Sequence, residues 1–315
     1  MAKLKKGAVK TCSELLQEYE SSQKSVFHPE KLIFQGVGKN DVYNISAPFE
    51  DEGELVIAGR VESRDSEQSS IVFFTEQDGV WTPREGGSVL TLQDPFYTKI
   101  GGELVLGGVQ IYPHPERDGA LAWRTVFYKG TQISKLEPFF TGPDGMKDLR
   151  IMELQDGSIA VFTRPQGDKG GRGKIGYSRV ASLEALSIQV IEDAPLLDGQ
   201  FTDEEWGGAN ELHLLKNGLI GVLGHIACFD EQGGRHYYPM VFALDPETGR
   251  HSDMELIAVR NRFLPGAAKR SDLEDVVFSG GLVRNADGTA YFYAGISDAE
   301  AHRMGIADPF IKFET

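Results

Sequence analysis

The sequence contains few cysteines and no long apolar segment. Cys12 and Cys228 are the only cysteines among 315 residues, too few for a disulfide framework, and they favour reduced thiols in a cytosolic protein. No apolar run approaches the length of a membrane span, and the lysine-containing N-terminus lacks the apolar core of a signal peptide. We therefore expect a soluble protein located in the cytoplasm.

The sequence also has fewer basic than acidic residues. Lys and Arg together number 32 against 47 Asp and Glu, which gives a formal net charge of −15. Such a surface repels phosphodiester backbones and anionic lipid, so we expect neither a nucleic-acid partner nor a membrane partner. An anionic substrate would need a local basic pocket inside this acidic shell.

Glycine, in contrast, is abundant. The 37 glycines, set against 14 prolines and a hydrophobic content of 40%, favour a real core made of short strands and tight turns. The exception is SELLQEYESSQKS, where a cap at Ser13 and apolar residues on one face predict a short helix. We expect an N-terminal extension over residues 1–30 and a single domain over residues 31–315.

One type of segment recurs five times along the chain. Each copy has an acidic residue, an apolar strand, a turn with glycine and a second apolar strand, as in KDLRIMELQDGSIAVFTRP (147–165). The acidic positions are separated by 53, 54, 63 and 64 residues, a period that suits a four-stranded unit. These positions are Asp41, Asp94, Asp148, Glu211 and Asp275.

Further strands are expected in the rest of each unit, for example in LAWRTVFYKG (121–130) and LSIQVIE (186–192). Strands at such short intervals, with turn residues between them, indicate an all-β fold. Five four-stranded units fit a five-bladed β-propeller. A pair of β-sandwiches is the alternative, which the fivefold recurrence disfavours.

The third copy shows why the ends of these hairpins matter. Asp148 lies eight residues before Asp156 in the turn, and Arg164 lies seven residues after Gly157. Antiparallel pairing across the Asp-Gly turn therefore brings this carboxylate and this guanidinium to the same end of the hairpin. The apolar middles would hold the blades together, while the polar ends meet elsewhere.

We expect the polar ends to converge at one mouth of the central channel, because the first strand of each propeller blade lines that channel. The same count from the turn glycine reaches Arg60 in the first copy and His225 in the fourth. Lys147, Arg164 and His225 together predict an oxyanion site. Each of these side chains could instead belong to a structural ion pair.

Four motifs also follow one another in a familiar order: QDPFYTKIGGELVL, KDLRIMELQDGSIAVFTRP, GLIGVLGHI and LEDVVFSGGLVRNADGTAYFYAGISD. Over about residues 38–300 they resemble glycoside hydrolase family 130, the five-bladed propeller mannoside phosphorylases and mannosidases. The resemblance implies a carbohydrate-active enzyme that cleaves a glycosidic bond, of the β-mannoside type, with inversion. It implies an oligosaccharide or glycoside substrate, inorganic phosphate as a possible co-substrate and no other cofactor.

The resemblance also implies roles for individual residues. Asp94 would be the general acid. Phosphate would be held by Lys147, Arg164 and His225. The expected substrate-binding residues are Asp41, Asp148, Glu211, Asp275, Asp298 and Arg60. The sequence departs from the family pattern in three places. Phe96 stands where an Arg is frequent, and Thr163 stands where the family has His. The LGHI segment lacks the aromatic residue and the following Gly of the family motif.

Other functions remain open on the residues alone. Water activated by Asp41 or Glu211 would make the protein a hydrolase, and a non-catalytic propeller could bind a glycan or another ligand at its mouth. A calcium-dependent lactonase type of site needs several oxygen ligands, and Asp41, Asn210 and Glu211 could supply some of them. Lys147 and Arg164 beside that site argue against a bound cation.

Overall fold

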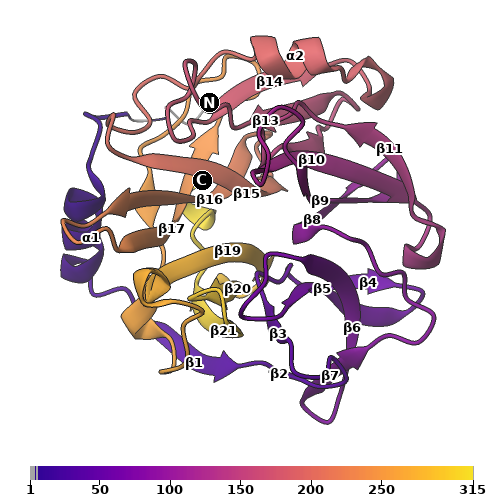
Figure 1. The fold of residues 1–315 in the computed structure, drawn as a ribbon. Coiled ribbons are helices and arrows are strands. Elements are labelled where there is room, and N and C mark those ends of the chain that lie inside the picture. The colour runs from indigo at the N-terminus through magenta and orange to yellow at the C-terminus, as the bar shows by residue number, and fades with distance from the viewer. Residues whose placement is uncertain (1–3, 5, 315) are drawn as a thin grey trace.

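The computed structural model describes residue 4 and residues 6–314, and these residues form mainly antiparallel β-sheet. The strands are arranged as consecutive antiparallel units around a common centre (Figure 1), and we number these units as blades 1 to 5 in chain order. The expected all-β propeller is confirmed, and the sandwich alternative is wrong.

Most blades are antiparallel meanders whose strands follow chain order. Blade 1 contains β2 (Ile33–Phe34), β3 (Asp41–Tyr43), β4 (Phe49–Asp51), β5 (Glu54–Glu62), β6 (Ser69–Gln77) and β7 (Val80–Pro83). Blade 2 contains β8 (Gln93–Ile100), β9 (Glu103–Pro113), β10 (Leu121–Gly130) and β11 (Glu137–Thr141). Blade 3 contains β12 (Arg150–Glu153), β13 (Ile159–Thr163) and β14 (Gly176–Val180).

Blades 4 and 5 share one continuous sheet. Blade 4 contains β15 (Trp206–Leu214), β16 (Ile220–Phe229), β17 (Arg235–Leu244) and β18 (Glu255–Leu256). Blade 5 contains β19 (Asp275–Arg284), β20 (Thr289–Ile296), β21 (Glu300–Ala307) and β1 (Val26–Lys31). A short parallel contact, His236 to Asp275 and Tyr237 to Val276, joins β17 to β19, whereas all other pairings within the two blades are antiparallel.

The hydrophobic core is divided among the interfaces between blades. Buried apolar residues of the described chain form five clusters, and each cluster joins two neighbouring blades: 1 with 2, 2 with 3, 3 with 4, 4 with 5, and 5 with 1. In the last of these, Ile57 of blade 1 packs in the same cluster as Tyr293 of blade 5. Five blades with five such interfaces form a closed ring.

The N-terminal part of the chain helps to close this ring. Strand β1 pairs with β21 as the outermost strand of blade 5, after which the chain continues into blade 1 (Figure 1). The predicted boundary after residue 30 therefore falls inside a strand of the propeller. The hairpin pattern could not show this, because β1 pairs with a strand near the other end of the sequence.

The predicted N-terminal helix is α1 (Cys12–Ser21). Thr11, not Ser13, is its cap: the Thr11 side chain accepts from Glu14 N–H, and the Glu14 carboxylate accepts from Thr11 N–H in return. The apolar face of α1 places Leu15 and Tyr19 in the cluster between blades 3 and 4. None of the described helices is long and apolar enough to cross a membrane.

The strand predicted at 186–192 is wrong. Residues 188–193 form a short helix, α2 (Ile188–Asp193), because the Ser187 hydroxyl caps the N–H of Val190 and the turn buries Ile191. At the outer edge of blade 3, Leu196 instead forms an isolated bridge to Gly176. Single 3₁₀ turns occur at Ile133–Lys135, Leu183–Ala185, Arg260–Arg262, Ser271–Leu273 and Ile311–Phe313.

Candidate active site

The β12–β13 hairpin has the predicted register. Arg150 pairs with Phe162 and Glu153 with Ile159 across the Asp-Gly turn. The hairpin therefore carries Asp148 and Arg164 to the same end, where Arg164 Nε lies 3.4 Å from Asp148 Oδ2. Both side chains are buried.

Several polar residues in or next to the strands around the centre have left-handed backbone. The φ angles are 45° at Asn44, 50° at Asp94 and 58° at Asp148, and 53° and 51° at Ser297 and Asp298. Asn and Asp tolerate this region better than other residues with a Cβ, and such conformations cluster at functional sites. At Asp94 the conformation accompanies a bulge between Gln93 and Phe96 in the β8–β9 pairing, which takes the side chain out of the regular alternation of the strand.

Asp94 belongs to a first group of polar residues, contributed by blades 1, 2 and 5, which we call the acid group. Its Oδ1 accepts hydrogen bonds from Asn44 Nδ2 at 2.8 Å and from Arg60 Nη1 at 3.1 Å. Arg60 is buried and also binds Glu62 at 2.5 Å. Within the described chain, Asp94 Oδ2 has no hydrogen-bond partner, so one carboxyl oxygen is fixed and the other is free.

Asp298 completes the acid group. Burial raises the pKa of the Asp298 carboxyl, the nearby charge of Arg60 opposes this rise, and the charge of Asp94 adds to it. Lys269 and Lys147 also oppose it.

A second group, contributed by blades 3 and 4, surrounds Asp148, and we call it the anion group. Burial alone would raise the pKa of Asp148, but the charges of Arg164 and Arg150, with smaller effects from His225 and Lys147, lower it below its ordinary range. Arg150 donates from Nε to the Asn210 carbonyl at 2.6 Å. Its guanidinium also lies 3.9 Å from the centre of the Phe96 ring, so the aromatic residue that departs from the family pattern supports a cation.

His225 in this group is neutral. Burial lowers the pKa of its imidazole to about 3, although the charge of Asp148 opposes the shift. The ring stacks on Tyr237, and Nδ1 lies 2.8 Å from Asn210 Oδ1. Because an amide oxygen can only accept, Nδ1 is the protonated nitrogen. The positive charge of the anion group therefore comes from lysine and arginine and not from His225.

Two donors in the anion group are buried and unsatisfied. Neither Arg164 Nη1 nor Asn210 Nδ2 has a hydrogen-bond partner among the described residues. Arg164 is otherwise held by the Gly207 carbonyl, which accepts from Nε at 2.7 Å. Buried donors without partners are costly, so this pair is expected to bind a ligand with acceptor oxygens.

Lys147 lies close enough to influence both groups. Its charge lowers the pKa of Asp148 and of His225 in the anion group, and it opposes the raised pKa of Asp298 in the acid group. Within the described part of the chain its ammonium forms no hydrogen bond and no ion pair. The acid group and the anion group are therefore neighbours, with a cation available to both.

Three of the predicted acids have other partners. Asp41 pairs with exposed Arg64 at 2.6 Å. Glu211 accepts from the backbone N–H of Leu282 at 2.7 Å and contacts His213. The site is therefore not the predicted ring of five equivalent acids.

The third of these acids, Asp275, lies 2.6 Å from His236 and accepts from the Tyr238 hydroxyl, both on the third strand of blade 4. The pattern of one acid per repeat thus included residues that stabilise blades and their junctions. Only Asp94 and Asp148 of the five enter the acid group and the anion group.

The residues that replace them stand close by in the sequence. Asn44 lies three positions after Asp41, and Asn210 directly precedes Glu211, next to a bulge between Ala209 and Glu211 in the β15–β16 pairing. The asparagine in the NELHLL segment was a usable signal for Asn210. Arg150 and Lys269 had no such signal, because each depends on contacts between blades.

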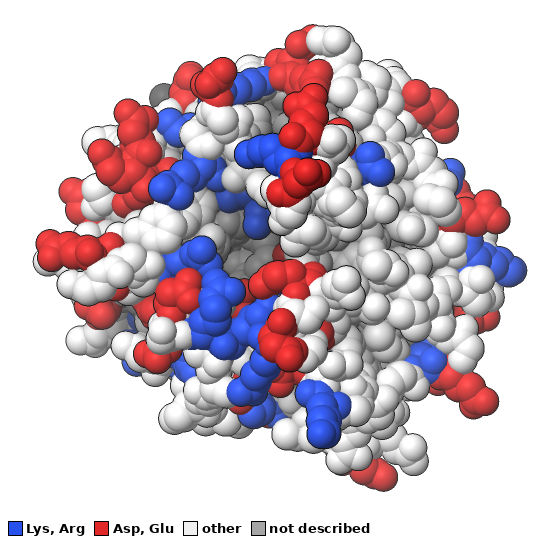
Figure 2. Space-filling view, in the orientation of Figure 1, with Lys and Arg blue, Asp and Glu red and all other residues white. Residues whose placement is uncertain are grey.

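On the surface, the face seen in Figure 2 is hollowed near the centre of the ring, and Lys, Arg, Asp and Glu side chains gather around the hollow. In the described chain, no set of three or more His, Cys, Asp or Glu residues is arranged to hold a metal ion. The set of Asp41, Asn210 and Glu211 considered for calcium is separated, because each residue has the different partners given above.

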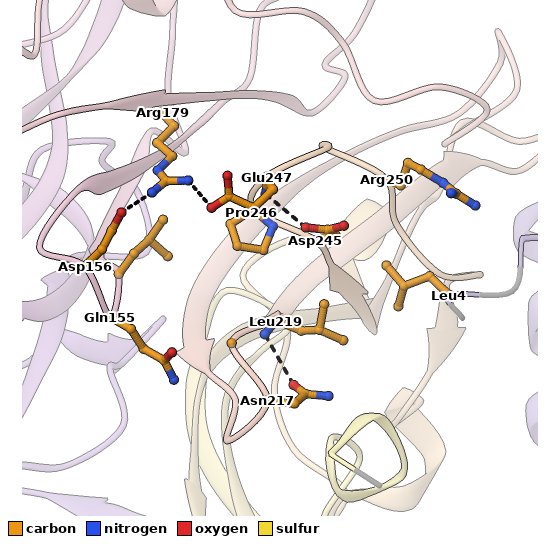
Figure 3. Close-up of a pocket in the computed structure, with 12 residues that line it drawn as sticks. Leu4, Gln155, Asp156, Arg179, Asn217, Leu219, Asp245, Pro246, Glu247 and Arg250 are labelled. Carbon is orange, nitrogen blue, oxygen red and sulfur yellow. Dashed lines mark hydrogen bonds and ion pairs between the residues drawn. The ribbon is translucent and has the colours of Figure 1, made fainter. Parts of the chain in front are cut away.

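A large cavity lies elsewhere, at the turns that follow β12, β15 and β17 (Figure 3). Its volume is about 580 Å³, and Arg179 in its wall is ion-paired with Asp156 and Glu247. Asp156 is at the turn end of the β12–β13 hairpin, whereas Asp148 and Arg164 are at the open end. This cavity is therefore remote from the anion group.

Comparison with known proteins supplies the family. Residues 18–312 match the family model described as "Protein of unknown function (DUF1861)". The chain belongs to this family. No curated protein matches the chain significantly.

Solved structures include close relatives of the chain. MPT-4, a mannose phosphorylase from Leishmania mexicana solved in complex with a phosphate ion, is 34% identical, with a TM-score of 0.88 over 96% of this chain and 95% of that one. MPT-1, a GDP-Man-dependent mannosyltransferase from the same organism, is 32% identical, with a TM-score of 0.87 over 97% of this chain and 98% of that one.

The β-1,2-mannobiose phosphorylase of Listeria innocua is more distant. It is 14% identical, with a TM-score of 0.58 over 88% of this chain and 93% of that one. At this identity the likeness concerns the fold. It confirms that the chain has the propeller architecture of glycoside hydrolase family 130, to which the four sequence motifs pointed.

Proposed function

We propose that the protein is an inverting glycoside phosphorylase that acts on β-mannosides. An oxygen of inorganic phosphate attacks the anomeric carbon, the glycosidic bond breaks, and a proton is delivered to the leaving oxygen. The products are an α-configured sugar 1-phosphate and an acceptor shortened by one unit. The mannose phosphorylase that is 34% identical was solved with phosphate, which agrees with this chemistry.

The observation that carries the proposal is the pair of buried, unpartnered donors at Arg164 Nη1 and Asn210 Nδ2. Phosphate supplies several strong acceptor oxygens, and charge-assisted bonds from arginine are among the strongest that a protein offers. Lys147, whose ammonium has no partner in the described chain, adds a second full positive charge. Neutral His225 keeps Nε2 as an acceptor, which suits a phosphate that still carries one proton.

Asp94 is the proposed proton donor. Asn44 and Arg60 fix Oδ1, so free Oδ2 is the oxygen that can carry a proton toward the leaving group. Burial raises the pKa of the Asp298 carboxyl, which favours a proton on this neighbour of Asp94. A carboxyl acid and a separate nucleophile site agree with inversion, which requires room for the nucleophile on the opposite face of the sugar.

The sugar itself would lie between the two groups. Asp298 and Asp148 are the proposed ligands of its hydroxyl groups, and Lys147 stands where it can reach both sugar and phosphate. Because Asp41, Glu211 and Asp275 have their own partners, we do not retain them as sugar ligands. Arg60 acts through Asp94, which it orients.

The test is a product analysis. β-1,2-Mannobiose is incubated with the protein with and without inorganic phosphate, and the products are identified by NMR; GDP-Man with an acceptor is assayed in parallel. We expect cleavage that depends on phosphate and yields α-mannose 1-phosphate. Free mannose in the absence of phosphate would instead indicate a hydrolase, and turnover only with GDP-Man would indicate a transferase like MPT-1.

Asp94→Asn is the matched variant, because it keeps the shape and removes the titratable proton. A positioned general acid contributes about a hundred- to ten-thousand-fold in rate, so kcat should fall by that range while the disaccharide still binds. A dinitrophenyl glycoside, whose leaving group needs no proton, should be spared most of the loss. Near-normal turnover of mannobiose by Asp94→Asn would show that the proton comes from another residue.

A further inference from the structure

The two cysteines of the chain meet at one packing interface. Cys12 is the first residue of α1, and Cys228 lies near the end of β16. Helix α1 lies beside blade 4 (Figure 1), and its buried face consists of Cys12, Leu15 and Tyr19. Cys228 packs against the same apolar cluster as these three residues. The fold therefore brings together two thiols that are far apart in the sequence.

The alternation of β16 explains why Cys228 faces the helix. Val222, Ile226 and Cys228 project from one side of the strand, because residues at even spacing share a face. Val222 and Ile226 belong to the cluster that contains the buried face of α1. The Cys12 thiol donates a hydrogen bond to the Cys228 sulfur, so the two sulfurs are in contact. We call these two residues the thiol pair.

We propose that the thiol pair forms a reversible disulfide, so that oxidation fastens α1 to blade 4. This modification site lies outside the acid group and the anion group, and it does not depend on the proposed function. Both thiols are free in the structure, which is therefore the reduced state of the pair. In a reducing compartment such a bond is expected to form only transiently, as in proteins that respond to oxidants.

Cys228 is the member of the pair that reacts with an oxidant. Its side chain is partly exposed, whereas Cys12 is 3% exposed. The hydrogen bond from Cys12 lowers the pKa of the Cys228 thiol, and burial opposes this shift. The charge of His236 lowers the pKa further, against smaller effects of Glu205 and Asp275. The thiolate is the nucleophilic form of cysteine, so these shifts favour attack by Cys228.

His236 is placed to supply that positive charge. It lies directly opposite Cys228 in the β16–β17 pairing, so the two side chains are on the same face of the sheet. Its Nδ1 is 2.6 Å from Asp275 Oδ2, and its Nε2 is 3.3 Å from Asp230 Oδ2. Only the imidazolium can donate from both nitrogens to carboxylates. Burial would lower the pKa of His236, but the hydrogen bonds to Asp275 and Asp230 raise it above its ordinary value.

Cys12 is held in position to complete the bond. The capping box of Thr11 and Glu14 fixes the start of α1, and the Cys12 N–H donates to Glu205 Oε1. Glu205 directly precedes β15, so this hydrogen bond ties the beginning of the helix to blade 4. The hydrogen bond to Cys228 and burial raise the pKa of the Cys12 thiol. Cys12 therefore keeps its proton until Cys228 has reacted.

The oxidant in this proposal is a peroxide, which accepts two electrons. The Cys228 thiolate attacks one oxygen of hydrogen peroxide, the O–O bond breaks, and a sulfenic acid and hydroxide form. The hydroxide takes a proton from solvent. The Cys12 sulfur then attacks the Cys228 sulfur, the S–O bond breaks, and the hydroxyl group leaves with the Cys12 proton as water. The two sulfurs are oxidised to a disulfide, and the peroxide is reduced to water.

The test is peptide mapping of the wild type. The reduced protein is freed of reductant, treated with excess hydrogen peroxide, alkylated under denaturing conditions and digested. We expect a peptide that joins Cys12 to Cys228, no free thiol, and recovery of both thiols after dithiothreitol. Free thiols at both positions after this treatment would overturn the inference. Links between different chains, or Cys228 oxidised to a sulfonic acid without a link, would overturn it equally.

Two matched variants separate the roles of the thiols. Cys12→Ser removes the thiol that resolves the sulfenic acid, so dimedone should label Cys228 after peroxide treatment. Cys228→Ser should leave Cys12 reduced and unlabelled. Labelling of Cys12 in Cys228→Ser, without labelling of Cys228 in Cys12→Ser, would contradict the proposed order of reaction. The mapping of the wild type needs neither variant, so it decides the question even if a variant does not fold.

Thermal unfolding tests whether the bond fastens the helix in its native position. A disulfide that closes the long loop between residues 12 and 228 strongly constrains the unfolded chain. We therefore expect the oxidised wild type to unfold at a temperature roughly 5–10 °C above that of the reduced protein. Peroxide should give no such rise in Cys12→Ser or Cys228→Ser. A linked protein that unfolds at the same or a lower temperature would show that the bond distorts the packing of α1, and it would overturn the proposal.

Discussion

Ionisation of Asp298 carries a cost for the fold. When folding raises the pKa of a carboxyl, the folded state loses stability as pH rises above the pKa of that group in the unfolded chain, about 3.9. The reason is that the carboxyl ionises more easily in the unfolded chain. Burial is the main cause of the rise at Asp298, and the charge of Asp94 adds to it. The contribution of Asp298 to the free energy of unfolding is therefore fully present at low pH, and it is lost as pH rises toward the pKa of Asp298 in the folded protein.

Asp298→Asn is expected to stabilise the protein at pH 7 to 8, because the amide is neutral at every pH. Each unit of raised pKa corresponds to about 1.4 kcal/mol in the free energy of unfolding. Urea titrations from pH 4 to pH 8 should show the gain at the upper end and its disappearance near pH 4. Asp41→Asn is the matched control, since Asp41 pairs with an exposed arginine, and it should give no gain. A variant that is no more stable than the wild type at pH 8 would contradict the raised pKa of Asp298.

A second prediction at the scale of a single residue concerns Arg164. Arg164→Ala removes the unpartnered Nη1 and a full charge from the anion group. A hydrogen bond to a charged group is worth about 1.5–3 kcal/mol. We therefore expect the phosphate affinity, measured by calorimetry, to fall at least tenfold. Arg64→Ala, at an exposed ion pair, controls for net charge and should change affinity little. Equal phosphate affinity in Arg164→Ala and the wild type would remove phosphate from this site.

Elements whose contacts are local could be predicted from the sequence. The β12–β13 hairpin followed from its turn and its alternating apolar residues, and the meeting of Asp148 with Arg164 followed from the register. The segment at 186–192 also alternates, but Ser187 caps a helical turn there, and a period of two cannot be told from a short helix over so few residues.

A bulge accounts for one of the predicted site residues that the structure does not bring together, Glu211. The count along each repeat assumed regular alternation, and an added residue in a strand shifts every later side chain to the other face. The β15–β16 bulge makes Asn210 and not Glu211 the member of the anion group. Nothing in the local sequence fixes the position of a bulge, because that position depends on packing between neighbouring blades.

Closure of the ring is a property of the whole molecule that no local pattern contains. Arg60 of blade 1 reaches Asp94 of blade 2, and Lys269, from the segment before blade 5, reaches Glu62 of blade 1. These contacts span distances in the sequence of 34 and 207 residues. The acid group can therefore form only if blades 5 and 1 are held together, and β1 is the strand that links them.

Gly305 is the point at which this closure can be tested. It lies in β21 opposite Phe27 of β1, and a Cβ added to it would meet Phe27 Cε2 at 1.9 Å. Gly305→Ala must displace the Phe27 ring from its edge contact with Tyr291, and overpacking of this kind costs about 1–3 kcal/mol. In a Phe27→Ala background the clash is absent, so the same substitution should cost much less.

A double-mutant cycle by urea denaturation measures this coupling. If β1 closes the ring, the variants lose stability with an unchanged denaturant slope, because all five blades still unfold together. A smaller slope would mean that β1 detaches on its own and that the ring persists without it. Equal costs of Gly305→Ala in both backgrounds would show that Phe27 does not pack on Gly305. The strand would then be held by other contacts, which include its backbone pairing and the Lys31–Glu300 and Glu30–Arg303 ion pairs.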